Sequence, residues 1–216
     1  MTTVRRSPFY GLCLVIGALL FGGAGLLHPV LRGDGATQLA TIAGMDAWRS
    51  IHWSLLFAIP LLLAGLAGFA LRHQETPGAG PARAGILVAT LGFAALMINI
   101  LFMASAGWQL AETYQRAEPG MTATDAVFVY DMIHPMGLAA ERLATFALGL
   151  AFYLLGWATW NGRLLPRWLA WGAFFAGAVS LVVPLAVYGS SVWLFYAQAT
   201  VVVWMAAAGV VMIARR

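Results

Sequence analysis

The chain has 216 residues, of which 62% are hydrophobic and 9% are charged. In soluble domains about a quarter of the residues are charged. The composition therefore excludes an ordinary water-soluble domain and predicts that lipid surrounds much of the chain. The net charge of +4 comes from twelve arginines without any lysine. Because they are scattered singly or in pairs near the ends of apolar runs, they indicate membrane topology and not nucleic-acid binding.

Six apolar runs predict six transmembrane helices, which we expect at residues 9–31, 51–71, 85–107, 140–160, 167–188 and 191–214. About 20 apolar residues suffice to cross a bilayer. The expected fold is an all-α integral membrane protein, a single six-helix transmembrane domain over residues 1–216.

A helical segment at 124–139 is expected to precede the fourth span. A helix from 124 to 160 would be roughly 55 Å long, against a hydrocarbon core of roughly 30 Å. The fourth helix is therefore expected to extend on the outer side, where 124–139 protrudes, folds over the bundle or lies on the membrane.

The charges between the spans differ between the two sides of the membrane. On one side every segment has more basic than acidic residues, and its arginines are Arg5, Arg6, Arg72, Arg83, Arg163, Arg167, Arg215 and Arg216. The other side is neutral to acidic and carries Asp34, Asp46, Glu112, Glu118, Asp125 and Asp131 together with three arginines. The positive-inside rule then places both termini in the cytoplasm and the protein in the cytoplasmic (inner) membrane.

Two histidines and two arginines are expected near the outer ends of the first two spans. His28 and His52 each lie about one turn inside the span, and Arg32 and Arg49 lie one turn nearer water on the same helix faces. Facing imidazoles predict a haem site, with the arginines at its propionates, or a divalent metal site that His134 joins. The alternative is that these amphipathic side chains only lie at the lipid headgroups.

A second set of ionisable residues belongs to the fourth helix. Asp131, His134 and Glu141 fall on nearly one helical stripe if the helix is continuous. Pro135 can kink the helix there, because it removes a backbone hydrogen bond. Ionisable groups inside a membrane are costly and by default suggest function. If the protein is an enzyme, these three residues are its candidate acid–base groups. The alternative is an interfacial pair of Glu141 with Arg142.

Three functions remain open at this stage. One is an outward-facing pocket lined by histidine and glutamate that binds haem or a metal ion. Another is an enzyme that performs acid–base chemistry on a lipid or isoprenoid-like substrate. The third is a non-catalytic accessory or transport-associated component. Besides the bilayer, the expected partners are an apolar or lipid-like small molecule and other subunits, docked through small-residue faces such as 22–25 and 65–68.

Overall fold

A computed structural model describes residues 8–116, 120–187 and 192–215. Within these ranges every regular element is an α-helix, and six helical stretches are long and apolar enough to cross a membrane. The expected all-α, multi-pass fold is thus confirmed. The helices are α1 (Phe9–Leu27), α2 (Gly35–Ala43), α3 (Trp48–His73), α4 (Ala79–Ala104), α5 (Ala106–Arg116), α6 (Ala123–Gly162), α7 (Arg167–Ala186) and α8 (Val192–Ala214).

Some residues used in the predictions lie outside the described ranges. They are the span limits 188 and 191 and the charged residues Arg5, Arg6, Glu118 and Arg216. The remaining charges still separate into a basic and an acidic end of the bundle.

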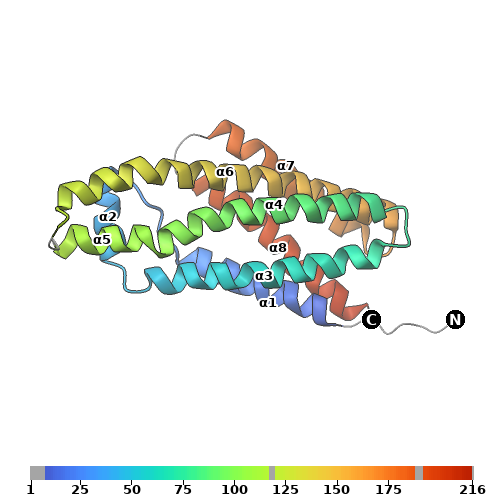
Figure 1. Cartoon of the computed structure of the whole chain (residues 1–216). Helices are drawn as coiled ribbons and strands as arrows, with labels where there is room; N and C mark the ends of the chain where they lie inside the picture. Colours follow the sequence, from blue (N-terminus) through green and yellow to red (C-terminus); the bar gives the residue numbers. More distant parts are fainter. Residues whose placement is uncertain (1–7, 117–119, 188–191, 216) are drawn as a thin grey trace.

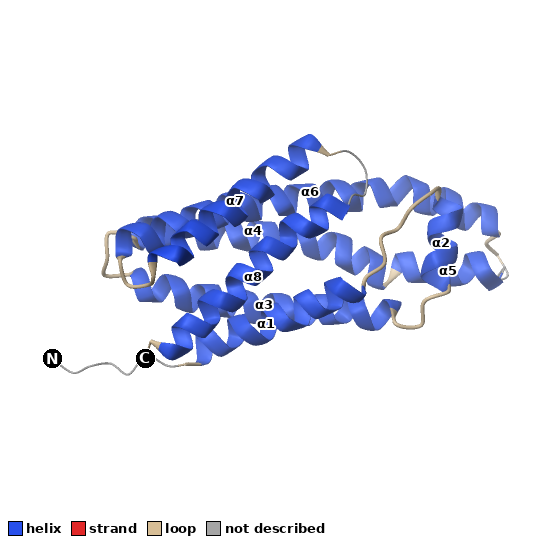
Figure 2. Ribbon diagram, turned by 180° about the vertical axis from the view of Figure 1, so that it is seen from behind, coloured by secondary structure: helices blue, strands red, loops and turns tan. Residues whose placement is uncertain are grey.

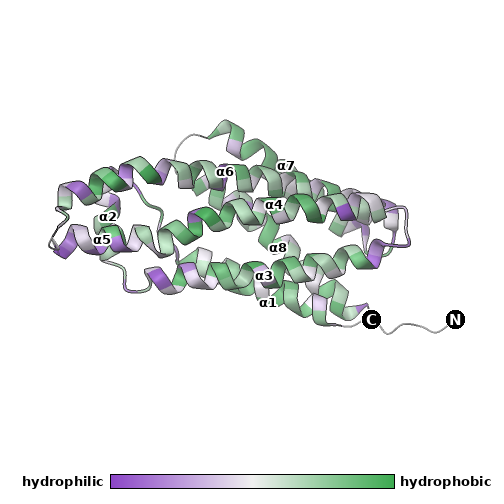
Figure 3. Cartoon of the chain, viewed as in Figure 1, coloured by the Kyte–Doolittle hydropathy of each residue, from purple (hydrophilic) through white to green (hydrophobic). Residues whose placement is uncertain are grey.

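Helices α3, α4 and α6 run along the long axis of the molecule, α7 and α8 are inclined to it, and the two ends of the molecule differ (Figures 1 and 2). Helix α1 begins and helix α8 ends at the same end of the molecule, while α2 and α5 lie at the opposite end (Figures 1 and 2). We call these the terminal end and the cap end. Apolar residues dominate the middle of the long helices, and hydrophilic residues gather toward both ends (Figure 3). This pattern fits a bundle with lipid around its middle.

Helix α6 is continuous over 40 residues and therefore contains both the fourth expected span and the segment 124–139. It begins with a capping box, in which Thr122 and Asp125 satisfy each other's backbone N–H groups. Pro135 lies inside the helix without ending it. At about 1.5 Å per residue, α6 is roughly 60 Å long and exceeds a bilayer core of roughly 30 Å.

The N-terminal half of α6 packs with α2 and α5 around a small core of its own, which we call the cap. Its largest fully buried side chains are Leu39, Ile42, Trp48 and Tyr130. Helices α2 and α5 have nine and eleven residues, so each is too short to cross a bilayer by itself. The cap therefore forms a second, smaller core at one end of the bundle.

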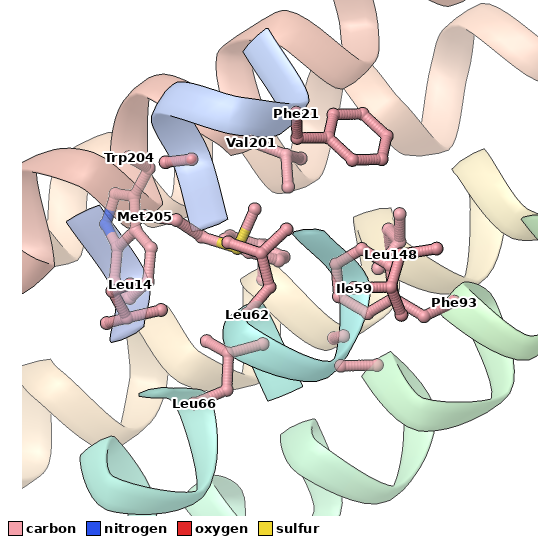
Figure 4. Close-up of a cluster of buried hydrophobic side chains, with 14 of the residues drawn as sticks. Leu14, Phe21, Ile59, Leu62, Leu66, Phe93, Leu148, Val201, Trp204 and Met205 are labelled. Atoms are coloured by element: carbon pink, nitrogen blue, oxygen red, sulfur yellow. The ribbon is translucent and has the colours of Figure 1, made fainter. Parts of the chain in front are cut away.

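The main core joins α1, α3, α4, α6, α7 and α8 through buried apolar side chains. Figure 4 shows ten of these, labelled Leu14, Phe21, Ile59, Leu62, Leu66, Phe93, Leu148, Val201, Trp204 and Met205. Within lipid such contacts stabilise by packing, so close approach of helices matters more than apolar surface area.

Small residues provide that close approach within the chain. Gly65 and Gly68 of α3 receive the side chains of Leu14 and Tyr10 from α1. Gly25 of α1 lies against Phe195 of α8. The small-residue faces expected to dock other subunits are thus at least partly occupied by the chain's own helices.

The first span is shorter than expected. Helix α1 ends at Leu27, whereas the prediction extended it to residue 31. His28 is the C-cap residue with an extended backbone, at φ −75° and ψ 123°. The cause is Pro29, because a residue that precedes proline is disfavoured in the α region. The prediction that His28 lies inside the first helix is therefore wrong.

Candidate functional site

A cavity of about 560 Å³ lies between α1, α3, α4, α6 and α8, toward the cap end of the bundle. We call it the membrane cavity. Most of its wall is apolar, with side chains such as Phe21, Leu55, Leu96, Phe195 and Val202. Six polar side chains also line it: His28, His52, Asn99, His134, Glu141 and Gln198. The chain thus brings its candidate imidazoles and a carboxylate to one apolar space.

His28 and His52 face each other directly. Their Nε2 atoms are 3.2 Å apart, and the ring planes meet at 68° with centroids separated by 4.9 Å. His28 reaches this position from the extended segment after α1, and His52 from the second turn of α3. Burial lowers the pKa of His28 below its usual value, which favours the neutral imidazole.

Trp48 holds this pair in place. Its carbonyl oxygen accepts a hydrogen bond from Nδ1 of His52 at 2.8 Å, which directs Nε2 of that ring toward His28. Its indole ring packs on both imidazoles, with centroid distances of 5.0 Å to His28 and 4.4 Å to His52. The indole N–H donates to the carbonyl of Met103 at 2.9 Å, so Trp48 also ties α3 to the end of α4.

Glu141 is the centre of a polar cluster contributed by three helices. The Asn99 amide of α4 donates to Oε2 at 3.3 Å, and the Gln198 amide of α8 donates to Oε1 at 3.4 Å. Gln198 also donates to the Thr145 hydroxyl at 3.1 Å. These hydrogen bonds to Glu141 from the described part of the chain are long and weak, so the carboxylate retains capacity to accept a shorter hydrogen bond from a ligand.

Asn99 is held by a tight fit against α6. Its Oδ1 atom is buried and has no hydrogen-bond partner among the described residues. The same atom lies against Gly137, where a side chain would collide with it. The glycine thus makes space for an amide whose carbonyl group stays available beside the cavity.

The three ionisable residues expected to form a column on α6 do not all line the membrane cavity. His134 lines the cavity, is 8% exposed and stacks on Tyr130 at 4.6 Å. Asp131 is exposed, is not among the lining residues and lies against Gly35 at the start of α2. Residues three apart lie nearly on one helix face, so the two side chains differ in depth: Asp131 is about one turn nearer the start of α6, at the level of α2, and His134 is at the level of the cavity.

The two arginines expected above the histidines are not part of the cavity wall. Arg32 and Arg49 are both exposed and absent from the lining. Arg32 does not share a helical face with His28, because α1 ends at Leu27. Their predicted contact with haem propionates therefore has no counterpart in this geometry.

A haem iron does not fit between His28 and His52. Two axial imidazoles need their nitrogens about 4 Å apart, on opposite sides of the macrocycle, since each metal–nitrogen bond is about 2 Å. The observed 3.2 Å separation leaves no space for that plane.

The three-histidine metal site also needs correction. Among the described residues, no group of three or more His, Cys, Asp and Glu side chains is close enough to hold a metal ion. His134 lines the same cavity but stacks on Tyr130 and does not join the pair. What the structure brings into direct contact is His28 with His52 alone.

Sequence reasoning missed the residues that orient the site. Trp48 is four residues before His52 on one helix, a spacing that signals a shared face. Tyr130 is likewise four residues before His134 and donates to Gln38 of α2 at 2.9 Å. The link from Gln198 to Glu141 joins residues 57 positions apart, and no local pattern reports it.

Comparison with known proteins gives no assignment for this arrangement: no family model, no curated protein and no solved structure matches the chain. The fold and the cavity therefore define a class only. The chain is a polytopic, all-helical membrane protein, and a mainly apolar cavity that is partly open at the surface lies between five of its helices.

Proposed function

We propose that this protein binds one amphiphilic, lipid-like molecule in the membrane cavity. The observation that carries this proposal is the combination of an apolar wall with His28, His52 and Glu141 in one space. An apolar chain would lie along α1 and α8, and a polar head would meet the histidine pair or Glu141. Small-molecule sites of about 300–1,000 Å³ are typical, so the cavity suits one chain and not a whole phospholipid.

The rim of the cavity supports entry from the bilayer. Leu26, Tyr196 and Val203 line the cavity and are also 79%, 53% and 68% exposed. These side chains belong to α1 and α8, so the wall on that side consists of residues that also face outward. A hydrophobic molecule dissolved in the membrane can then enter sideways without crossing water.

We further propose that the cap end faces away from the cytoplasm. Arg72, Arg83, Arg163 and Arg167 lie at the terminal end of the helices, whereas Asp34, Asp125 and Asp131 belong to the cap end. The positive-inside rule assigns the basic end to the cytoplasm. The cavity then opens at the outer leaflet, beneath the cap.

Acid–base chemistry on the bound molecule is the second candidate function. Imidazole and carboxylate side chains are the usual proton-transfer groups of enzymes, and the cavity presents both. In this reading Glu141 and His134 act on the ligand, while Asp131 belongs to the cap. If Glu141→Gln keeps ligand binding but blocks conversion of the bound molecule, the protein is an enzyme.

Filling the cavity tests the proposal. Ala199 of α8 lines the cavity, so Ala199→Trp is expected to displace the ligand. Val210, on the same helix and 56% exposed, is not a lining residue, and Val210→Trp is the matched control. Native mass spectrometry of protein extracted from membranes should show a bound amphiphile in the wild type and the control only. Absence of any bound amphiphile from the wild type, or equal occupancy in Ala199→Trp, would refute the proposal.

A further inference from the structure

We propose that the His28–His52 pair binds one divalent transition-metal ion of the zinc class, with its open coordination positions directed into the membrane cavity. Zinc bound by histidine has metal–nitrogen bonds of about 2.0–2.1 Å in a tetrahedral arrangement. Two ligand atoms on such a metal are then about 3.3 Å apart. The Nε2 atoms of His28 and His52 are 3.2 Å apart, which matches one edge of that tetrahedron.

The hydrogen bonds of the two rings support the same conclusion. The Trp48 carbonyl can only accept, so Nδ1 of His52 carries the proton and Nε2 presents a lone pair to His28. If the proton of His28 is likewise on its Nδ1, two lone pairs face each other across 3.2 Å, and a cation between them removes the repulsion. Metal-binding histidines are commonly oriented in this way, through the nitrogen that does not bind metal.

The remaining coordination positions determine the class of ligand. Two neutral imidazoles leave the charge of the metal uncompensated beside apolar walls, and an unpaired charge in such surroundings is strongly unfavourable. An anionic oxygen, from a carboxylate or a phosphate, both completes the coordination and supplies the missing charge. This part rests on the proposed function: the anionic oxygen is the head of the amphiphile in the cavity.

Metal binding is tested with Co²⁺ and Zn²⁺ alone, on tag-free protein in phosphatidylcholine nanodiscs. We expect one equivalent of Co²⁺ with the visible absorption of a tetrahedral site. His28→Gln and His52→Gln keep a polar side chain of similar size and should lose this absorption, whereas His134→Gln should retain it. X-ray absorption of zinc-loaded wild type should give two imidazole ligands at about 2.0 Å, a result that needs no variant to fold.

The outcomes separate the two proposals. If the wild type binds neither ion, or if both histidine variants retain the absorption, the pair is an ordinary imidazole hydrogen bond and the metal site is refuted. That result does not bear on amphiphile binding, which the Ala199→Trp experiment tests separately. Conversely, failure of amphiphile binding leaves Co²⁺ binding as a separate measurement.

The source of the anionic oxygen is tested on the cobalt-loaded protein. Addition of oleate should shift the visible absorption, while acetate or inorganic phosphate at the same concentration should not. An equal shift with acetate would show that water-soluble anions reach the metal, which contradicts a lipid head. The absence of any shift with all three anions would refute the anionic ligand.

Discussion

At the scale of single residues, Trp48 connects the features of this site. It is fully buried, orients His52 through its carbonyl and packs on His28. Its indole also satisfies the carbonyl of Met103, next to the last residue of α4. The last carbonyls of a helix lack intrahelical partners and need such a donor when they are buried. One side chain thus serves both the histidine pair and the junction between α4 and α5.

Trp48→Phe is expected to lower the free energy of unfolding by about 1–3 kcal/mol, because the Met103 carbonyl loses its donor in a buried position. Thermal unfolding in detergent measures this change. Trp53→Phe is the matched control, since Trp53 is 41% exposed and stacks on Phe57 at the outside of α3. Equal stability of the two variants would show that the bond from Trp48 to Met103 contributes little.

At the scale of elements, α6 is the support of the whole site. Its first half builds the cap, its middle presents His134 and Glu141 to the cavity, and its second half packs closely on α7. The close packing depends on Gly149 and Gly177, whose missing side chains let the two backbones approach. The continuous helix thus joins the cap to the cavity wall in one element.

Gly177→Ala is expected to destabilise the fold by about 1–3 kcal/mol through overpacking. Its added Cβ would lie 2.8 Å from the backbone nitrogen of Tyr153 and 2.9 Å from the carbonyl oxygen of Gly149. Backbone atoms of two packed helices cannot move aside as a side chain does. Gly23→Ala provides the control, since its Cβ would meet no atom within 4 Å, and alanine favours a helix over glycine. Thermal unfolding of both variants decides, and a Gly177→Ala protein as stable as Gly23→Ala would contradict the packing argument.

At the scale of the whole molecule, the cap and the membrane cavity form one continuous unit. His28 enters the cavity from the segment that leads into α2, and Met103 lies at the junction that leads into α5. The cap helices therefore begin where the cavity wall ends. A cap on the outer side of the membrane would separate the proposed metal ion and ligand head from bulk water.

Cysteine labelling tests the orientation of the molecule. The single native cysteine, Cys13, is buried, and Cys13→Ser provides the background. Thr41→Cys in the cap is expected to react with a membrane-impermeant maleimide in intact cells. Asn161→Cys, exposed at the terminal end of α6, should react only after the cells are permeabilised. The reverse result would place the cap in the cytoplasm.

The sequence by itself determined the membrane class, the six apolar helices and their approximate limits. Composition and run length suffice for this, because a spanning segment must satisfy its backbone internally and match the bilayer thickness. The sequence also identified His28, His52, His134 and Glu141 as unusual, since ionisable groups near lipid are rare. Local chemistry carries these signals, so no knowledge of helix packing is needed to detect them.

Only the tertiary structure decided which of these residues act together. Pro29 ended α1 early, so His28 meets His52 from a loop, and Arg32 is exposed outside the cavity wall. The position of α2 divided the expected column, because Asp131 lies against Gly35 of α2 whereas His134, one turn further along α6, lines the cavity. Such pairings depend on crossing angles, helix ends and distant contacts, which arise from packing of the whole bundle and not from spacing along the chain.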